Sequence, residues 1–132
     1  KAFDSVNHSH ILSVLKQKGV DEHIIALITE LYRNVTTSIQ VKKARTESIG
    51  IHIGVKQGDP MSPLLFNLAL DPLLCKLENS GYGYQHCDKN ITAMAFADDL
   101  VLLSSSWDGM NRNIKILETF CDLTGLKVQG EK

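Results

Sequence analysis

Residues 91–103 read ITAMAFADDLVLL, in which two adjacent aspartates separate two short apolar runs. Runs of this length and composition are typical of buried strands. Neighbouring side chains of one continuous strand point to opposite faces, so Asp98 and Asp99 cannot share a ligand there but can do so at the tip of a hairpin. We therefore predict a strand, an Asp-Asp turn and a strand, with both carboxylates directed at a cation such as Mg²⁺, which prefers oxygen ligands. A solvated polar turn is the alternative that this stretch alone leaves open.

Composition sets the class of protein. The 132 residues are 43% hydrophobic, which suits one soluble domain, residues 1–132, with a core of its own. No apolar run reaches the ~18 residues of a membrane span and no signal-peptide pattern is present, so we expect an intracellular protein without a membrane partner. Fourteen basic and fifteen acidic residues give a net charge of −1, which does not favour nucleic-acid binding. A phosphate-binding surface is then expected largely elsewhere, and the abrupt start at Lys1 suggests a piece of a longer polypeptide.

The order of expected elements favours an α+β domain. Asn7, Asp21 and Ser62 are the expected caps of three helices, with Pro63 as the first residue of the third. Alternating apolar residues between residues 37 and 53 predict a hairpin. The expected helices cover about residues 8–18, a segment containing residues 24–31, and about residues 62–79 and 107–124.

A second polar signal precedes the third expected helix, where residues 54–63 read GVKQGDPMSP. Gly58 would let a backbone approach a ligand closely, and Gln57 offers both donors and an acceptor on one side chain. An ordinary turn with a polar tip is the alternative. A phosphate-binding P-loop is excluded because no Gly-Lys-Ser/Thr follows.

Histidines and cysteines give no sign of a further site. His8 and His10 stand two apart at a helix start and face different ways, with no thiol at ligand spacing, so we interpret them as surface histidines. The thiols form no CxxC pair and are interpreted as reduced and buried. They are Cys75, Cys87 and Cys121.

Four stretches form a recognisable set when taken in order: KAFDSVNH at residues 1–8, GVKQGDPMSPLLF at 54–66, FADD at 96–99 and GLKV at 125–128. They resemble the ordered motifs of reverse transcriptases, most closely those of non-LTR retrotransposons of the R2 group. Group II intron proteins share much of the set. The resemblance runs along the whole chain and implies a polymerase palm, an antiparallel sheet backed by helices, within an incomplete right-hand architecture.

The resemblance also implies a chemistry, RNA-directed DNA polymerisation with two Mg²⁺ ions at the transferring phosphates. Asp98 and Asp99 match the metal-binding aspartate pair of the family. A third aspartate ligand of the family precedes the matched run, so it is expected upstream of Lys1. Asp4 follows the matched Phe3 and does not correspond to that ligand.

Four further residues match positions at which the family binds the incoming nucleotide. Phe3 matches an aromatic ring that crowds the ribose 2′ carbon and excludes ribonucleotides, although a core Phe would occupy the same position. Gln57 and Gly58 match the loop beside the nucleotide and the template. Lys132 matches a lysine that is a candidate proton donor to pyrophosphate.

The implied partners are an RNA template, a DNA primer, deoxynucleoside triphosphates and the remaining domains of a parent polyprotein, which is expected in the nucleus. Fingers and most of a thumb are not among the matched stretches, so the 132 residues alone should be inactive. The competing hypothesis is a non-catalytic palm-like module that binds nucleic acid or protein. A group II intron-type enzyme is the other alternative.

Overall fold

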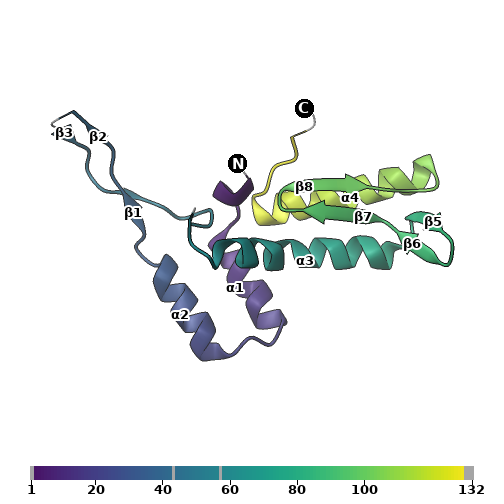
Figure 1. The fold of residues 1–132 in the computed structure, drawn as a ribbon, viewed down its shortest axis with the longest axis horizontal. Helices are drawn as coiled ribbons and strands as arrows, with labels where there is room; N and C mark the ends of the chain where they lie inside the picture. Colours follow the sequence, from purple (N-terminus) through teal and green to yellow (C-terminus); the bar gives the residue numbers. More distant parts are fainter. Residues whose placement is uncertain (1, 43, 57, 130–132) are drawn as a thin grey trace.

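The computed structural model describes residues 2–42, 44–56 and 58–129. Helices alternate with short antiparallel strand pairs, which confirms the mixed helix-and-strand class expected from the sequence (Figure 1). The helical elements are η1 (Ala2–Asp4), α1 (His8–Gln17), α2 (Glu22–Tyr32), α3 (Ser62–Ser80) and α4 (Trp107–Thr124). The strands are β1 (Thr36–Thr37), β2 (Gln40–Val41), β3 (Ala44–Arg45), β4 (Ile49–Gly50), β5 (Tyr84–His86), β6 (Lys89–Ile91), β7 (Ala93–Phe96) and β8 (Asp99–Leu102).

Helix α3 is the centre of the core. Its sequence is apolar on nearly every side, and such a helix is stable only where neighbours cover it. Helices α1 and α4 and strand β7 all contact it. Its buried apolar residues are Leu65, Phe66, Ala69, Leu73 and Leu77. In the described part of the chain, no helix joins enough length to enough apolar character to cross a membrane.

The start of α3 differs from the prediction by one residue. Met61 is the N-cap and Ser62 is already helical, so Pro63 occupies the second position. The Ser62 hydroxyl does not cap the helix, because it donates instead to the carbonyl oxygen of Lys56 at 2.6 Å. The backbone N–H of Met61 donates to the Asp59 carboxylate at 2.8 Å. The side chains therefore fasten the preceding loop to the helix.

Of the two residues expected to cap the first two helices, only one makes a side-chain capping hydrogen bond. The Asp21 carboxylate accepts a hydrogen bond from the His23 N–H at 2.8 Å, as a capping residue should. Asn7 makes no side-chain cap bond. Its backbone N–H donates to the Thr124 carbonyl, and its side chain lies against Gly125. Asn7 thus joins the start of the chain to the end of α4.

Helix α2 is covered on one side only. Its apolar residues form a stripe, of which Ile25 and Ile28 are buried in the core. The remaining members, Ile24, Leu27 and Leu31, are 42–61% exposed. The helix predicted around residues 24–31 is confirmed, but no described element packs over the outer half of its apolar stripe.

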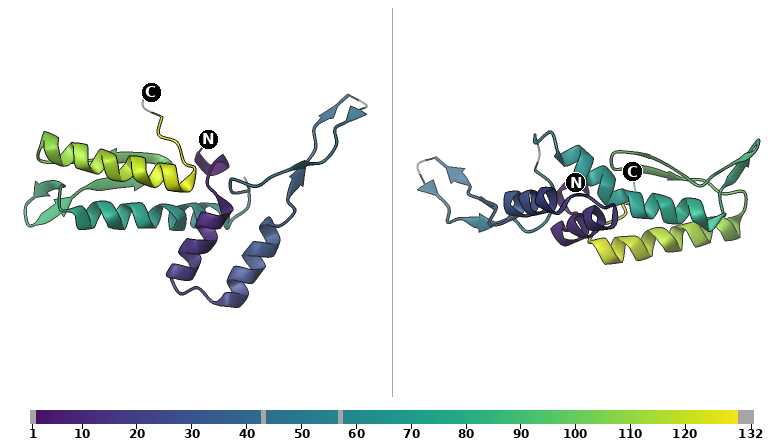
Figure 2. Two further views of the ribbon diagram at one scale, coloured as in Figure 1. Left: turned by 180° about the vertical axis from the view of Figure 1, so that it is seen from behind. Right: turned by 90° about the horizontal axis from the view of Figure 1, so that it is seen from below.

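Residues 36–53 form a hairpin that we call the arm, and it extends away from the helices (Figures 1 and 2). Strand β1 pairs with β4, and β2 pairs with β3, both antiparallel. The hairpin predicted for this region is therefore confirmed, although its ladder is interrupted between the two strand pairs. Its apolar residues Ile39, Val41 and Ile49 remain exposed.

The prediction of three buried thiols is wrong for two of them. Cys75 lies on the exposed side of α3, and Cys87 lies in the turn between β5 and β6. Cys121 is half-buried on α4, and burial raises the pKa of its thiol. All three cysteines are free.

Candidate active site

Asp98 and Asp99 lie at the tip of the β7–β8 hairpin. The two strands pair in register from Ala93 opposite Leu102 to Phe96 opposite Asp99, which leaves Ala97 and Asp98 as the two-residue loop. Both aspartates are exposed. The predicted order of strand, turn and strand is confirmed, but the turn contains Ala97 and Asp98, and Asp99 is the first residue of β8.

The loop of this hairpin is held in a strained backbone conformation. Ala97 has a φ of 51°, whereas Asp98 has no positive φ. A positive φ at the first loop residue alone is typical of a type II′ turn, where glycine is favoured. A non-glycine residue in this region costs about 1–3 kcal/mol. The surrounding strands therefore impose a conformation that the loop residues would not adopt alone.

The hairpin is covered on one face only, which corrects the expectation of fully buried strands. Helices α3 and α4 contact it through β7 and β8. On the opposite face, cross-strand pairing places Phe96 beside Asp99 and Met94 beside Val101. Phe96 is 85% exposed, and Met94 and Val101 are about half exposed at 54% and 50%. The apolar runs thus form one partly covered face and one open face, and the periodicity of the sequence does not show how far each face is covered.

The donors at the tip suit a hard cation. Mg²⁺ is commonly held by one or two carboxylates, several waters and the phosphates of a substrate. Asp98 and Asp99 supply two such carboxylates at an exposed position. Among the described residues, no three His, Cys, Asp or Glu side chains are grouped closely enough to hold an ion by themselves. The chemistry of the pair fits Mg²⁺ in a site that other groups would have to complete.

Phe3 lies at the edge of the core near the start of α3. Its ring stacks on Phe66, with ring centroids 4.2 Å apart and planes 14° apart. Its carbonyl oxygen accepts a hydrogen bond from the Val55 N–H at 2.7 Å. The Phe3 side chain is half-buried. One ring face is therefore fixed by packing while part of the side chain stays open to solvent.

The loop between β4 and α3 contains a close backbone contact at Gly54, a residue that the sequence analysis did not single out. Gly54 has a φ of +85°, and a Cβ there would lie 2.8 Å from backbone atoms of Asp4. Gly58 has a φ of +86°, but a Cβ there would meet nothing within 4 Å. The feature of the sequence that could have identified Gly54 is its position as the first residue of the GVKQG stretch. Gln57, the other residue predicted in this loop, lies outside the described residues.

Residues of helices α1 and α2 contact this loop. The His8 Nε2 atom lies 2.7 Å from the Gly54 carbonyl oxygen, and the His8 ring packs against Tyr32 with centroids 4.6 Å apart. The Lys56 ammonium donates to the Leu31 carbonyl at 2.9 Å and lies 5.7 Å from the centroid of the Tyr32 ring. The sequence pattern gave no sign of these contacts.

The interpretation of His8 and His10 as surface histidines is wrong. Both side chains are half-buried. The His10 Nε2 atom lies 2.8 Å from the Ala69 carbonyl oxygen, and its ring meets Phe120 edge-on at 5.5 Å. Each histidine thus connects α1 to another part of the core, because an imidazole offers both an apolar ring and a hydrogen-bonding nitrogen.

Several of the predicted residues lie toward one end of the molecule. Phe3 and the residue 54–61 loop meet the first turns of α3, and the tip of the β7–β8 hairpin points toward the same end (Figures 1 and 2). The segment after α4 returns there too, with Leu126 buried in the core. Lys132, the predicted proton donor, lies outside the described residues.

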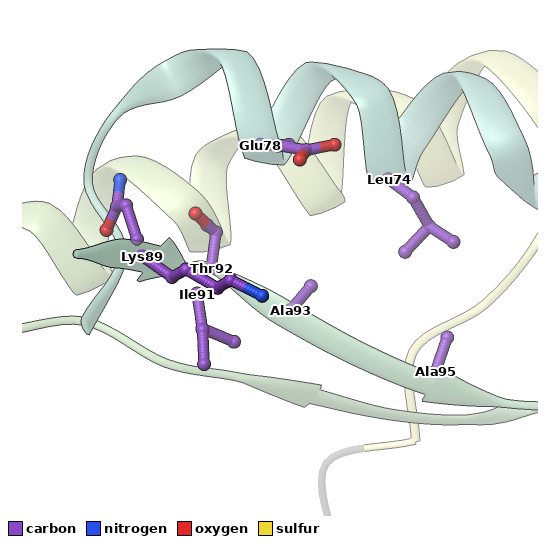
Figure 3. A pocket seen from close by; sticks show the side chains of 8 residues that line it. Leu74, Glu78, Lys89, Ile91, Thr92, Ala93 and Ala95 are labelled. Atoms are coloured by element: carbon purple, nitrogen blue, oxygen red, sulfur yellow. The ribbon is translucent and has the colours of Figure 1, made fainter. Parts of the chain in front are cut away.

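A hollow of about 500 Å³ lies elsewhere, between α3 and strands β6 and β7. Figure 3 shows Leu74 and Glu78 of α3 on one side of it and Lys89 of β6 with Ala93 and Ala95 of β7 on the other. Neither aspartate lines it. The aspartate pair therefore stands on an open tip and not in this hollow.

Residues 1–132 match the family model described as reverse transcriptase (RNA-dependent DNA polymerase). The chain is 40% identical over 134 residues to a retrovirus-related Pol polyprotein from the type-1 retrotransposable element R2 of Popillia japonica, covering 100% of this chain and 19% of that protein. It is 40% identical over 133 residues to the protein of the same description from Nasonia vitripennis, covering 100% of this chain and 13% of that protein. It is 36% identical over 132 residues to the Pol polyprotein from the type-2 retrotransposable element R2DM of Drosophila melanogaster, covering 100% of this chain and 12% of that protein. The chain thus spans 19% or less of the length of these relatives.

Proposed function

The chain belongs to the reverse transcriptase family, and on that premise we propose that it forms the palm of an RNA-directed DNA polymerase from an R2-type non-LTR retrotransposon. The observation that carries the proposal is the position of Asp98 and Asp99 at the tip of a two-stranded antiparallel hairpin. A binding scaffold has no need for adjacent carboxylates between two apolar strands. Residues 1–132 are proposed to act as one region, the palm with its adjoining segments.

Under this proposal Asp98 and Asp99 bind divalent metal ions, two Mg²⁺ in the family's chemistry, together with a third carboxylate from a segment preceding Lys1. When bound, such ions stabilise the charge on the attacking and leaving oxygens of the transferring phosphate. The contribution of this chain is to hold Asp98 on a two-residue loop and Asp99 at the first position of the following strand, in a hairpin backed by α3 and α4. A site carried on such regular elements is positioned more accurately than one on a long loop.

The nucleotide side of the proposal uses Phe3, Gln57, Gly58 and Lys132. The stack on Phe66 holds the Phe3 ring in place, which a ring that excludes a 2′-hydroxyl by contact would require. The space around Gly58 is open, so a ligand can approach its backbone there. Gln57 is proposed to face the nucleotide and template, and Lys132 to donate a proton to pyrophosphate.

The proposed partners are an RNA template, a DNA primer and deoxynucleoside triphosphates, with the remaining domains of a parent polyprotein. The relatives are themselves described as Pol polyproteins of retrotransposable elements, and they are much longer than this chain. We place the parent protein in the nucleus, where a retrotransposon would meet the DNA that receives its copy. The 132 residues alone are expected to be inactive, because they supply two of the three proposed carboxylates.

Primer extension on an RNA template tests the proposal in a protein that also contains the segments flanking residues 1–132. Asp98→Asn should lower Mg²⁺-dependent incorporation by about a hundredfold or more, since loss of one electrostatic group at a developing charge typically costs 10²–10³ in rate. Asp88→Asn is the matched control, because Asp88 occupies the turn of the neighbouring β5–β6 hairpin. Near-normal incorporation by the Asp98 variant would favour the non-catalytic binding module instead.

A further inference from the structure

The charge of the chain is divided unevenly between the arm and the rest. The 18 residues of the arm, 36–53, contain three basic residues and one acidic residue, which gives a charge of +2. The other 114 residues contain 11 basic and 14 acidic residues, which gives −3. Of the basic residues, Lys42 and Arg45 lie at the end of the hairpin, and Lys43 stands between them in the sequence. A total charge near zero therefore conceals a basic projection.

The arm also contains a polar hollow of about 360 Å³. Every described residue that lines it carries a hydroxyl or a guanidinium group, and none of these residues carries a carboxylate. The lining residues are Thr36, Thr37, Ser38, Arg45, Thr46 and Ser48. Hydroxyl and guanidinium groups donate hydrogen bonds to phosphate oxygens, so the composition of the hollow suits an anion.

Arg45 is held ready for such a ligand. Its Nε donates to the Ser38 hydroxyl at 2.6 Å, and Gln40 lies opposite it on the paired strand. Within the described ranges, Arg45 has no carboxylate partner. A guanidinium group fixed at Nε presents its terminal N–H groups as a planar fork, the geometry that binds phosphate oxygens in pairs.

We propose that the arm binds the phosphate backbone of a nucleic-acid strand, with Arg45 and the hydroxyl-lined hollow contacting one phosphate and Lys42 at the hairpin end contacting a neighbouring one. The arm and the Asp98–Asp99 tip lie on different parts of the molecule (Figure 1), so this binding requires neither a metal ion nor a nucleotide. Contacts to phosphates carry no direct sequence information, so binding is independent of base sequence. A polynucleotide fits better than free phosphate, because cations along a projecting hairpin can meet successive phosphates together.

Fluorescence anisotropy with a labelled 20-nucleotide single-stranded RNA tests this proposal on the 132-residue chain in EDTA. Each phosphate contact to a single strand contributes about 0.7 to the slope of log K against log salt concentration. Lys42→Gln/Arg45→Gln should therefore lower the slope by about 1.4. The ratio of wild-type to variant affinity should then shrink about sevenfold between 50 and 200 mM salt.

The matched control is Lys76→Gln/Lys115→Gln, which removes the same charge from exposed positions on α3 and α4. An equal loss of slope in both double variants, or no saturable RNA binding by the wild-type chain, would overturn the proposal. The proposal would also be overturned if the arm variant lowered the affinity for deoxynucleotides as much as the affinity for RNA, because that result would identify a nucleotide site. A change of oligomeric state in Ile39→Ser/Val41→Ser, with RNA binding unchanged by the basic substitutions, would show that the arm binds protein. Because EDTA excludes metal chemistry, none of these results depends on whether Asp98 and Asp99 support polymerisation.

Discussion

Gly54 and Gly58 form a natural matched pair for testing the close contact between the residue 54–61 loop and the start of the chain. Their φ angles are +85° and +86°, so alanine is strained to the same degree at either position. That strain is about 1–2 kcal/mol. Each substitution also restricts the unfolded chain to a similar extent, and this effect cancels when the two variants are compared.

The two positions differ in what an added Cβ would meet. At Gly54 it would lie 2.8 Å from backbone atoms of Asp4, whereas at Gly58 it would meet nothing within 4 Å. The backbone of Asp4 cannot rotate away as a long side chain would. Forcing extra volume into a packed region typically costs 1–3 kcal/mol. Gly54→Ala should therefore destabilise the chain by about 2–5 kcal/mol, and Gly58→Ala by about 1–2 kcal/mol.

Urea denaturation followed by circular dichroism measures the difference directly. With an unchanged m value, the additional loss in Gly54→Ala should appear as a lower denaturation midpoint than that of Gly58→Ala. Equal midpoints would refute the reasoning, because they would show that the backbone of Asp4 shifts at no cost. A change in m for Gly54→Ala alone would indicate that the start of the chain had detached from the core.

Two further outcomes are expected. Phe3→Ala in the polymerising protein should raise the ratio of ribonucleotide to deoxynucleotide incorporation. If Phe3 is only a packing residue, the incorporation of both nucleotides should fall together. The loss of stability should in that case be smaller than the ~3–5 kcal/mol that truncation of a fully buried Phe costs. The Lys18 ammonium hydrogen-bonds to Asp71 and lowers the pKa of that carboxyl. The contribution of Asp71 to stability is then complete above its ordinary pKa and is lost as pH falls through the lowered value. Asp71→Asn should thus reduce the loss of stability in acid, measured as the midpoint of thermal unfolding against pH, and an unchanged acid dependence would show that the pair contributes nothing.

Sequence patterns predicted those elements that are determined by interactions between residues close together in the chain. The hairpin around Asp98 was predictable because two short apolar runs flank a polar pair, and Asp21 was predictable as a cap because a short carboxylate reaches the next free N–H. The match of the whole chain to the reverse transcriptase family confirms the resemblance that the ordered motifs indicated. The metal and nucleotide roles of the individual residues stay predictions.

The remaining features depend on partners that are distant in the sequence. Gly54 is constrained by Asp4, and His8 is half-buried because Gly54 and Tyr32 contact it from other segments. Periodicity identified the apolar stripe of α2 but not that its outer half stays open. In the same way, the net charge of the chain showed that the protein as a whole is not basic, but it could not show that the arm is basic, because net charge contains no information on where the charges lie.

The contact of Asn7 with Thr124 and Gly125 has a topological consequence. It brings together two segments that are separated by most of the chain, and Val6 and Leu126 share the core beside it. Element η1 and the described segment that follows α4 accordingly lie near each other (Figures 1 and 2). A short peptide joining them would close the backbone into a ring, and new ends could be opened at an exposed turn such as Cys87–Asp88. The contacts that hold the fold together are thus compatible with a circular order of its elements, in which the chain would begin at another exposed turn.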